Sequence, residues 1–304
     1  MLRSTARLMS GRAAVAPSRA SPWASAANVY LSEGRNSELL ELLRRAAGPQ
    51  CVHVFADVAY NRTGFTLASR DAGAVHDSVL RLASLALQTL DLRTHEATHP
   101  RLGVVDHVSV HAVSPEGAAP NSDAAQGATE LALRLGDSLS AHLPVYFYGA
   151  ASPTRKPLDE VRRSLGYFQG DGRSAPPDLG PPPAARSGVV CVGALPWVIN
   201  FNLVLAGSAD MDAEAVLQRA RVVAAAVSQR RGGPAGCQSM ALPHEGNTVE
   251  VACNLLSPAA PPPEEVRRLV AAAAQAQGLR IERDYCTGLT PQQIWAAALR
   301  VDAM

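Results

Sequence analysis

Four of the eight histidines lie between positions 95 and 111, and two of them form a pattern associated with metal chemistry. The run from His95 to His99 reads H-E-A-T-H, which matches the H-E-x-x-H signature of zinc metalloproteases. That signature needs a continuous helix, which brings both imidazoles onto one face and leaves the glutamate as general base. Pro100 follows His99 directly, and proline disfavours the helical conformation of the residue before it. We therefore expect no metal site here, and a zinc hydrolase remains only a minor alternative.

His99 instead lies in a predicted loop at the mouth of a strand, close in sequence to Arg101 and Asp106. An imidazole can act as a general acid and base near neutral pH, and a guanidinium can bind a carboxylate through two hydrogen bonds. These residue types favour proton transfer beside an anion contact. By composition alone, an ordinary loop histidine without a function is the simpler interpretation.

Two predicted strands carry polar residues on one face. In the run 198–203, the period of two places Asn200 and Asn202 on the same face, and in the run 249–254 it groups Glu250 with Asn254. A solvated face is normal for an antiparallel sheet, but asparagine is a poor strand former. The pattern therefore leaves two interpretations open: a face in water, or the polar lining of a ligand cavity.

The elements that must position these residues alternate between strand and helix. From residue 28 to 187 the predicted order is strand, helix, strand, strand, helix, strand, with one more helix and strand added, and a similar pattern repeats over 188–304. A proline-rich segment, 174–185, joins the two parts as a linker or an ordered binding loop. This order predicts an α+β fold of two α/β sandwich subdomains of the β-α-β-β-α-β type, with helices on the outer faces.

Composition excludes several classes of protein. With 304 residues, 47% of them hydrophobic and 18% charged, the chain can bury a substantial core. Its formal charge of +1 and the absence of a Lys/Arg block argue against a nucleic-acid partner. The five cysteines include no C-x-x-C pair, which argues against a disulfide framework and a zinc ribbon. No apolar run reaches the 18 or so residues that a membrane span requires.

The first 27 residues differ from the rest of the chain. They contain Arg3, Arg7, Arg12 and Arg19, many alanines and serines, and no acidic residue. The repeated arginines exclude the apolar centre of a secretory signal, so the segment is predicted to be a transit peptide for a mitochondrion or plastid. The alternative is an ordinary disordered tail on a cytoplasmic protein.

The segment 98–106, T-H-P-R-L-G-V-V-D, resembles the H-P-R-[LM]-G-x-x-D stretch of the glutamate formiminotransferase family, in which the histidine is catalytic. Further segments are similar to family motifs and occur in the family's order, so the resemblance covers nearly all of the chain after residue 27. These segments are S-E-G-R-N at 32–36, N-R-T at 61–63, V-Y-F-Y-G at 145–149, D-L-G-P at 178–181, N-F-N at 200–202 and N-L-L at 254–256.

The resemblance implies two subdomains whose sheets enclose a ligand tunnel, and a chemistry that moves a formimino group from N-formimino-L-glutamate to the co-substrate tetrahydrofolate. It implies His99 as general acid/base, with Asp57 as the candidate to orient its imidazole or contact N5 of the folate. The implied substrate-binding residues are Asn61, Arg62, Arg101 and Asp106. The implied folate-binding residues are Gly180, Pro181, Pro182, Pro183, Ala184, Ala185, Arg186, Ser187 and Gly188 of the loop, and Asn200, Asn202 and Asn254 of the strands.

This chain departs from the family pattern in several places. Thr98 stands where the family usually has glutamate, the segment 57–61 is shorter, and Tyr30-Leu31 replaces Asn-Phe. The chain ends at Met304, so we expect a transferase without the cyclodeaminase domain of the animal enzyme. A folate-binding protein that uses 5-formyl-tetrahydrofolate, or that lacks catalysis, is the main alternative. The expected partners are small molecules, a folate and a formimino-amino acid; for the oligomeric state a homodimer is the candidate.

Overall fold

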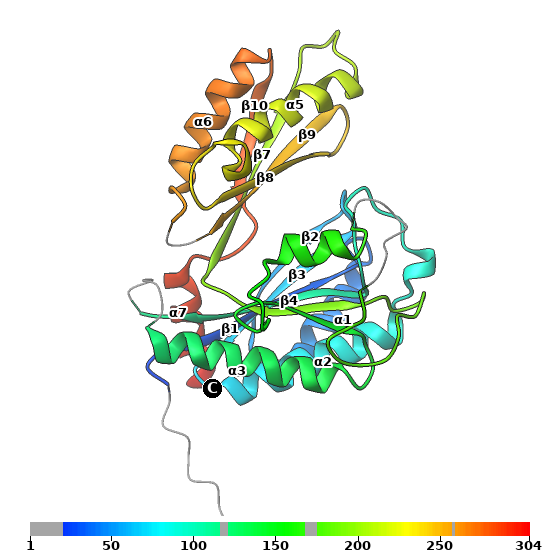
Figure 1. Cartoon of the computed structure of the whole chain (residues 1–304), viewed down its shortest axis with the longest axis vertical. Helices are drawn as coiled ribbons and strands as arrows, with labels where there is room; N and C mark the ends of the chain where they lie inside the picture. Colours follow the sequence, from blue (N-terminus) through cyan, green and yellow to red (C-terminus); the bar gives the residue numbers. More distant parts are fainter. Residues whose placement is uncertain (1–20, 116–120, 168–174, 257–258) are drawn as a thin grey trace, which may run out of the picture.

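The computed structural model describes residues 21–115, 121–167, 175–256 and 259–304 as two mixed α/β bodies, each a sheet with helices on its outer face (Figure 1). Most of the predicted transit peptide, residues 1–20, lies outside the described residues. The predicted α+β class with two subdomains is confirmed. No helix in the described part of the chain is long and apolar enough to cross a bilayer.

The first sheet has six strands in the order β2-β3-β1-β4-β6-β5. Strands β1 to β4 pair with one another in antiparallel fashion, whereas β6 runs parallel to both β4 and β5. The strands are β1 (Ala24–Leu31), β2 (Cys51–Asp57), β3 (Arg62–Ser69), β4 (Val105–Val113), β5 (Val145–Gly149) and β6 (Val190–Ala194).

Helices α1 (Ser37–Ala47), α2 (Ala72–Thr89) and α3 (Ser122–Leu139) cover one face of this sheet. Each helix begins at a side chain that accepts a hydrogen bond from its first turn, which satisfies a backbone donor that the helix leaves unpaired. Along the strands, apolar positions alternate with polar ones, so the face that points away from these helices carries polar side chains. The N-caps are Asn36, Asp71 and Asn121.

The second sheet has four strands in the order β10-β7-β9-β8, backed by α5 (Ala213–Val227) and α6 (Pro263–Ala276). Its element order, β7-α5-β8-β9-α6-β10, repeats the order β1-α1-β2-β3-α2-β4, and its strands are arranged in the same way as β2-β3-β1-β4. The remaining strands are β7 (Val198–Ala206), β8 (Cys237–Pro243), β9 (Thr248–Leu256) and β10 (Arg280–Cys286).

A strand and a helix that were predicted for the second subdomain associate with the first sheet. The strand that was expected to open the second subdomain is β6, and it pairs inside the first sheet. The last helix, α7 (Pro291–Asp302), returns to the first sheet, where Ile294 and Ala298 pack against alanines of β1 and β3 (Figure 1). Neither contact has a local signal, because the partners are far away in the sequence.

Strand β1 begins at Ala24, earlier than the expected start at Ala27. Ala24, Ala26 and Ala27 are all fully buried, since the chain is covered by α2 on one face and by α7 on the other. A run of small residues that is buried on both faces shows no alternation of polar and apolar types, which is the signal used to recognise a strand. The predicted leader, residues 1–27, therefore overlaps a structural strand. The short elements α4 (Leu158–Ser164), Leu92–Thr94 and Gln229–Arg231 complete the fold.

Candidate active site

The polar faces of the two sheets lie opposite each other. In β7 and β9 the amide side chains turn away from the core beneath α5 and α6, as the period of two predicted. The Asn200 Nδ2 donates to the Asn254 Oδ1 over 2.6 Å, and the Asn202 Nδ2 donates to Glu250 Oε1 over 2.8 Å. The hydroxyl of Tyr30 in β1 donates to the Asn200 Oδ1 at 3.3 Å, so the amide face looks at the first sheet.

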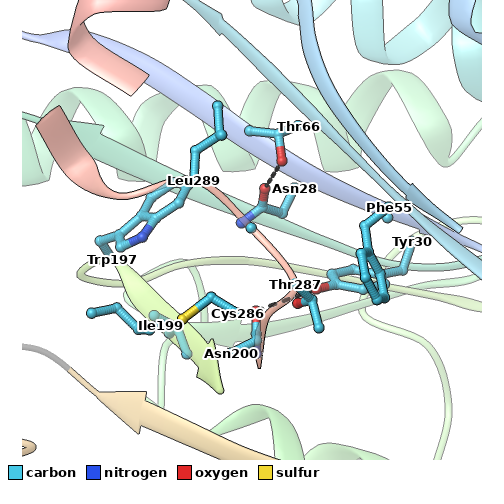
Figure 2. A pocket seen from close by; sticks show the side chains of 13 residues that line it. Asn28, Tyr30, Phe55, Thr66, Trp197, Ile199, Asn200, Cys286, Thr287 and Leu289 are labelled. Carbon is cyan, nitrogen blue, oxygen red and sulfur yellow. Dashed lines mark hydrogen bonds between the residues drawn. The ribbon is translucent and has the colours of Figure 1, made fainter. Parts of the chain in front are cut away.

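A narrow pocket lies between the sheets at this contact, and Figure 2 shows side chains from both sheets around it. Its open space is about 20 Å³, which is enough for about one water molecule. Trp197 is 6% exposed, and its indole Nε1 has no hydrogen-bond partner in the described structure. All lining side chains are uncharged: Asn28, Tyr30, Phe55, Thr66, Trp197, Val198, Ile199, Asn200, Cys286, Thr287 and Leu289, with Gly64 and Gly288.

His99 lies on an irregular loop that leads into β4. Its Nδ1 donates to the carbonyl of Pro100 over 2.7 Å, and its Nε2 accepts from Arg62 Nη1 over 3.0 Å. These two contacts assign the proton to Nδ1 and leave the lone pair on Nε2. Burial, reinforced by the Arg62 guanidinium, lowers the pKa of His99 to about 3. The ring is therefore a neutral hydrogen-bond acceptor at neutral pH.

Two arginines share a single buried carboxylate beside His99. Asp106 is 1% exposed; its Oδ2 accepts from Arg162 Nη2 at 2.6 Å and from Arg62 Nη2 at 3.2 Å. The Nδ1 of His107 accepts from the same two groups, at 2.8 Å and 3.2 Å. Burial lowers the pKa of His107 to about 3, so His107 is neutral. The cluster thus carries two positive charges and one negative charge, an imbalance that suits an anionic ligand.

Asp106 was expected to bind substrate, but its atoms are already engaged. The remaining oxygen, Oδ1, accepts the backbone N–H of Leu102 over 2.7 Å. Burial works against ionisation of Asp106, yet the Arg162 guanidinium and the neighbouring donors hold its pKa far below the usual range. The carboxylate therefore orients the two guanidinium groups. The Nε atoms of Arg62 and Arg162 are buried and have no hydrogen-bond partner among the described residues.

Asn61, His95 and Arg101 hold the loop that carries His99. Asn61 adopts a left-handed conformation, with φ of 47°; its side chain accepts from Gly34 N and donates to Glu96 O. His95 Nε2 contacts the Asn61 carbonyl at 2.9 Å, and Arg101 Nη2 donates to the carbonyl of His95 over 2.7 Å. The segment 95–99 is not helical, so the two imidazoles of the H-E-x-x-H match do not share a helix face.

Asp57, at the end of β2, does not touch the His99 imidazole through any hydrogen bond recorded among the described residues. Its Oδ1 accepts the backbone N–H of Tyr60 at 2.8 Å, and its Oδ2 lies 3.8 Å from His244 Nε2. The orientation that the resemblance attributed to Asp57 comes instead from the carbonyl of Pro100 and from Arg62. Asp57 is part of a second polar cluster next to His99.

The residues that directly follow the proline-rich segment form backbone hydrogen bonds with the two ends of the loop that carries His99. We refer to the segment 174–188 as the proline-rich loop. The carbonyl of Arg186 accepts from Leu92 N, and that of Ser187 accepts from Val104 N, both over 2.9 Å. A pocket of about 420 Å³ lies where the two loops meet. Its lining is Leu92, Arg101, Leu102, Tyr146, Leu165, Pro183, Ala184, Ala185, Gly188 and Val189.

The two glycines of this loop are explained by the chain's own backbone. The resemblance implied that Gly180 and Gly188 belong to the folate-binding residues. Both have positive φ, and a Cβ on Gly180 would lie 2.2 Å from the carbonyl of Leu143, while one on Gly188 would lie 2.1 Å from the carbonyl of Leu102. Their small size is therefore required by packing against the α3–β5 connection and the His99 loop.

Several residues of the site were not identified from the sequence as functional. Arg162 comes from the short helix α4, and His244 from the hairpin between β8 and β9; neither belongs to a motif. Aromatic rings complete the site, since Arg62 lies 4.3 Å over the ring of Tyr30 and Arg162 lies 4.5 Å over that of Tyr167. In the sequence, Arg162 is distinguished only by its charge on a short predicted helix. Arginines on protein surfaces share that feature, so it does not indicate a functional residue.

Comparisons with known proteins identify the family of this chain. Residues 24–195 match the family described as formiminotransferase domain, N-terminal subdomain. A formiminotransferase cyclodeaminase-like protein of Arabidopsis thaliana is 38% identical over 288 residues, which cover 88% of this chain and 93% of that protein. A glutamate formimidoyltransferase of Thermoplasma acidophilum is 25% identical over 274 residues, covering 86% of each chain. The formimidoyltransferase-cyclodeaminase of Mus musculus is 30% identical over 191 residues, which cover 57% of this chain and 32% of that protein.

Proposed function

Since this chain belongs to the formiminotransferase family, we propose that it is a one-carbon transferase that moves the formimino group of N-formimino-L-glutamate to tetrahydrofolate. The observation that carries the proposal is the pairing of the neutral His99 Nε2 with Arg62, inside a cluster that has one uncompensated positive charge. The site thus combines a proton acceptor with a group that binds carboxylates. N-formimino-L-glutamate carries an electrophilic carbon and two carboxylates, so its groups match those of the site.

Arg62 and Arg162 are the carboxylate-binding groups of the proposed site. A donor carboxylate would satisfy their unpaired Nε groups and the excess positive charge. Arg62 can then turn toward the ligand, which frees the lone pair on His99 Nε2. His99 accepts the proton that N5 of the folate loses as N5 attacks the formimino carbon. Donor binding and activation of the base are therefore coupled through Arg62.

Folate is proposed to occupy the 420 Å³ pocket between the proline-rich loop and the His99 loop, with its ring reaching toward His99. Arg101 lines that pocket and suits a carboxylate of the folate tail. Asn200, Asn202 and Asn254 face the first sheet and are proposed to line the path that the substrates share. In this proposal the path is a continuous tunnel between the two sheets.

A donor panel tests the proposal. Purified protein is incubated with tetrahydrofolate and, separately, N-formimino-L-glutamate, N-formyl-L-glutamate or no donor, and the folate product is identified by mass spectrometry. We expect 5-formimino-tetrahydrofolate from the first donor only. Formation of 5-formyl-tetrahydrofolate alone, or folate binding without any product, would reject the formimino assignment in favour of a formyl-folate enzyme or a folate-binding protein.

A further inference from the structure

His244 reaches from the second subdomain into the site of the first. It follows β8 at the hairpin to β9, and its side chain is only 4% exposed. Its Nε2 lies 3.8 Å from Asp57 Oδ2 and 3.9 Å from Glu250 Oε2, so carboxylates from both sheets face the same nitrogen. Its Nδ1 is buried and has no hydrogen-bond partner in the described part of the chain.

Tyr60 places His244 next to His99. The ring centroids of Tyr60 and His244 are 5.3 Å apart in an edge-to-face contact, and those of Tyr60 and His99 are also 5.3 Å apart. The two imidazoles are therefore neighbours across one phenol ring. Tyr60 is 6% exposed and its hydroxyl is buried, so bulk water is excluded from this contact.

The proposed transfer requires two proton movements of opposite direction. N5 of the folate must lose a proton, and the nitrogen of the departing glutamate must gain one before it can leave. His99 is suited to the first, because its Nε2 is a hydrogen-bond acceptor and its neighbour Arg62 disfavours a proton on the free ring. A second imidazole beside it can supply the other proton without waiting for His99 to return the one it has taken.

We propose that His244 is a second catalytic residue, the general acid that protonates the leaving nitrogen of the donor through its Nδ1, while His99 serves as the base. This inference rests on the proposed function. Asp57 raises the pKa of His244 above that of an ordinary histidine, whereas burial and Arg62 lower that of His99. Two titratable groups with opposite shifts in one site suit the division of acid and base roles.

The step balances as follows for a donor that binds as an amidinium cation. The N5 lone pair bonds to the formimino carbon, and the π pair of the C=N bond moves to the terminal nitrogen. The N5 proton passes to His99 Nε2. The His244 proton then passes to the glutamate nitrogen, the terminal nitrogen re-forms the double bond, and the carbon–nitrogen bond breaks with its pair on glutamate. His99 loses a proton and His244 regains one, so no proton is consumed.

The charged and titratable groups around His244 favour this protonated acid. Asp57 faces it from β2 and Glu250 from β9; Glu245, its chain neighbour, also favours the charged form. Tyr60 contacts its ring from the β2–β3 turn. Glu250 is fully buried and is held by Asn202 and by the hydroxyl of Tyr285, so its position is defined by the second sheet.

The test compares two donors that differ in how strongly their leaving nitrogen needs an acid. The glutamate nitrogen must be protonated to leave, whereas a formamidine of a carboxylated aniline releases a weakly basic amine. We expect His244→Gln to lower kcat on the order of 10²-fold with formiminoglutamate and about tenfold or less with the aniline donor. The wild-type fall in kcat/KM at high pH, caused by deprotonation of His244, should disappear in the variant.

His53→Gln is the matched control, because His53 also links the two subdomains, through Nε2 and the carbonyl of Thr287 at 3.2 Å. It should leave both donors and the pH profile nearly unchanged. His244→Asn, with folding checked by circular dichroism, replaces His244→Gln if the latter does not fold. Equal loss with both donors, or no loss, would overturn the acid role, whereas a folded wild type that is inactive with both donors would overturn the proposed function itself.

Discussion

The guanidinium of Arg62 donates to Nε2 of His99 over 3.0 Å, so a cation covers the lone pair that the proposed reaction needs. The same guanidinium contacts Asp106 and His107, and it stacks on Tyr30. Any anion that binds Arg62 therefore changes the basicity of His99. In the proposed mechanism, this contact keeps the lone pair of His99 covered until the donor binds Arg62.

Removing the Arg62 charge should raise the pKa of His99. In Arg62→Met the desolvation of the ring remains but the neighbouring cation is gone, so we expect a pKa above 3 yet still below the ordinary value of about 6.5. A titration of the histidine ring signals by NMR measures this directly. Arg186→Met, a change on the exposed loop, should leave His99 unaffected. An identical His99 titration in wild type and Arg62→Met would contradict the assigned contact.

Removal of the imidazole tests the base role. His99→Ala is expected to lower the transfer rate on the order of 10²- to 10⁴-fold, because proton transfer by a positioned side chain contributes about that much. Tetrahydrofolate affinity, measured by calorimetry, should change little. His142→Ala, at an exposed histidine after α3, serves as the control. A His99→Ala protein that transfers as fast as wild type would exclude this mechanism.

The amide pair of Asn200 and Asn254, on the face of the second sheet that looks at the first, should be needed for binding rather than for folding. A single Asn200→Leu leaves the Asn254 Oδ1 without its 2.6 Å donor and is expected to cost about 1–3 kcal/mol. The double variant Asn200→Leu/Asn254→Leu removes both polar groups, so its stability should recover while ligand binding stays impaired. Urea denaturation and calorimetry measure the two effects. Normal ligand binding by the double variant would favour a simple structural role for these amides.

The contribution of the first half of β1 can be measured by truncation. A chain that begins at Ser21 should keep the thermal stability of the full chain, whereas one that begins at Asn28 should be strongly destabilised. The second truncation removes the first half of β1, including three fully buried alanines that pack between α2 and α7. Thermal melting compares the two chains, and equal melting temperatures would show that this half-strand is dispensable. In a reporter fusion, residues 1–27 are proposed to direct import into a mitochondrion or plastid.

Stability should fall in mild acid because of buried neutral histidines. The folded pKa of His99 and of His107 is about 3, below the value of about 6.5 in an unfolded chain. The unfolded state therefore binds more protons below pH 6.5 or so, and the stability that is fully present above that pH is lost progressively as the pH falls toward 3. Chemical denaturation at several pH values measures the slope. His107→Gln should flatten it, and an unchanged slope would rule out His107 as a contributor.

Much of the fold follows from local patterns. The alternation of Asn200 and Asn202 with apolar neighbours predicted which residues share a face, and β7 has that arrangement. Pro100 predicted a break in helical structure at His99, and the loop there is irregular. Both are consequences of the backbone geometry of a few consecutive residues.

The sequence by itself therefore determined the class of fold, the repeated order of elements and the family, because periodicity and short motifs lie within contiguous segments. Only the tertiary structure decided that β6 pairs within the first sheet and that α7 packs on it. It also decided that Asp106 binds two arginines, and that Arg162 and His244 lie near His99. These relationships join residues that are far apart in the chain. Their contacts depend on how the two sheets pack against each other, which no local spacing encodes.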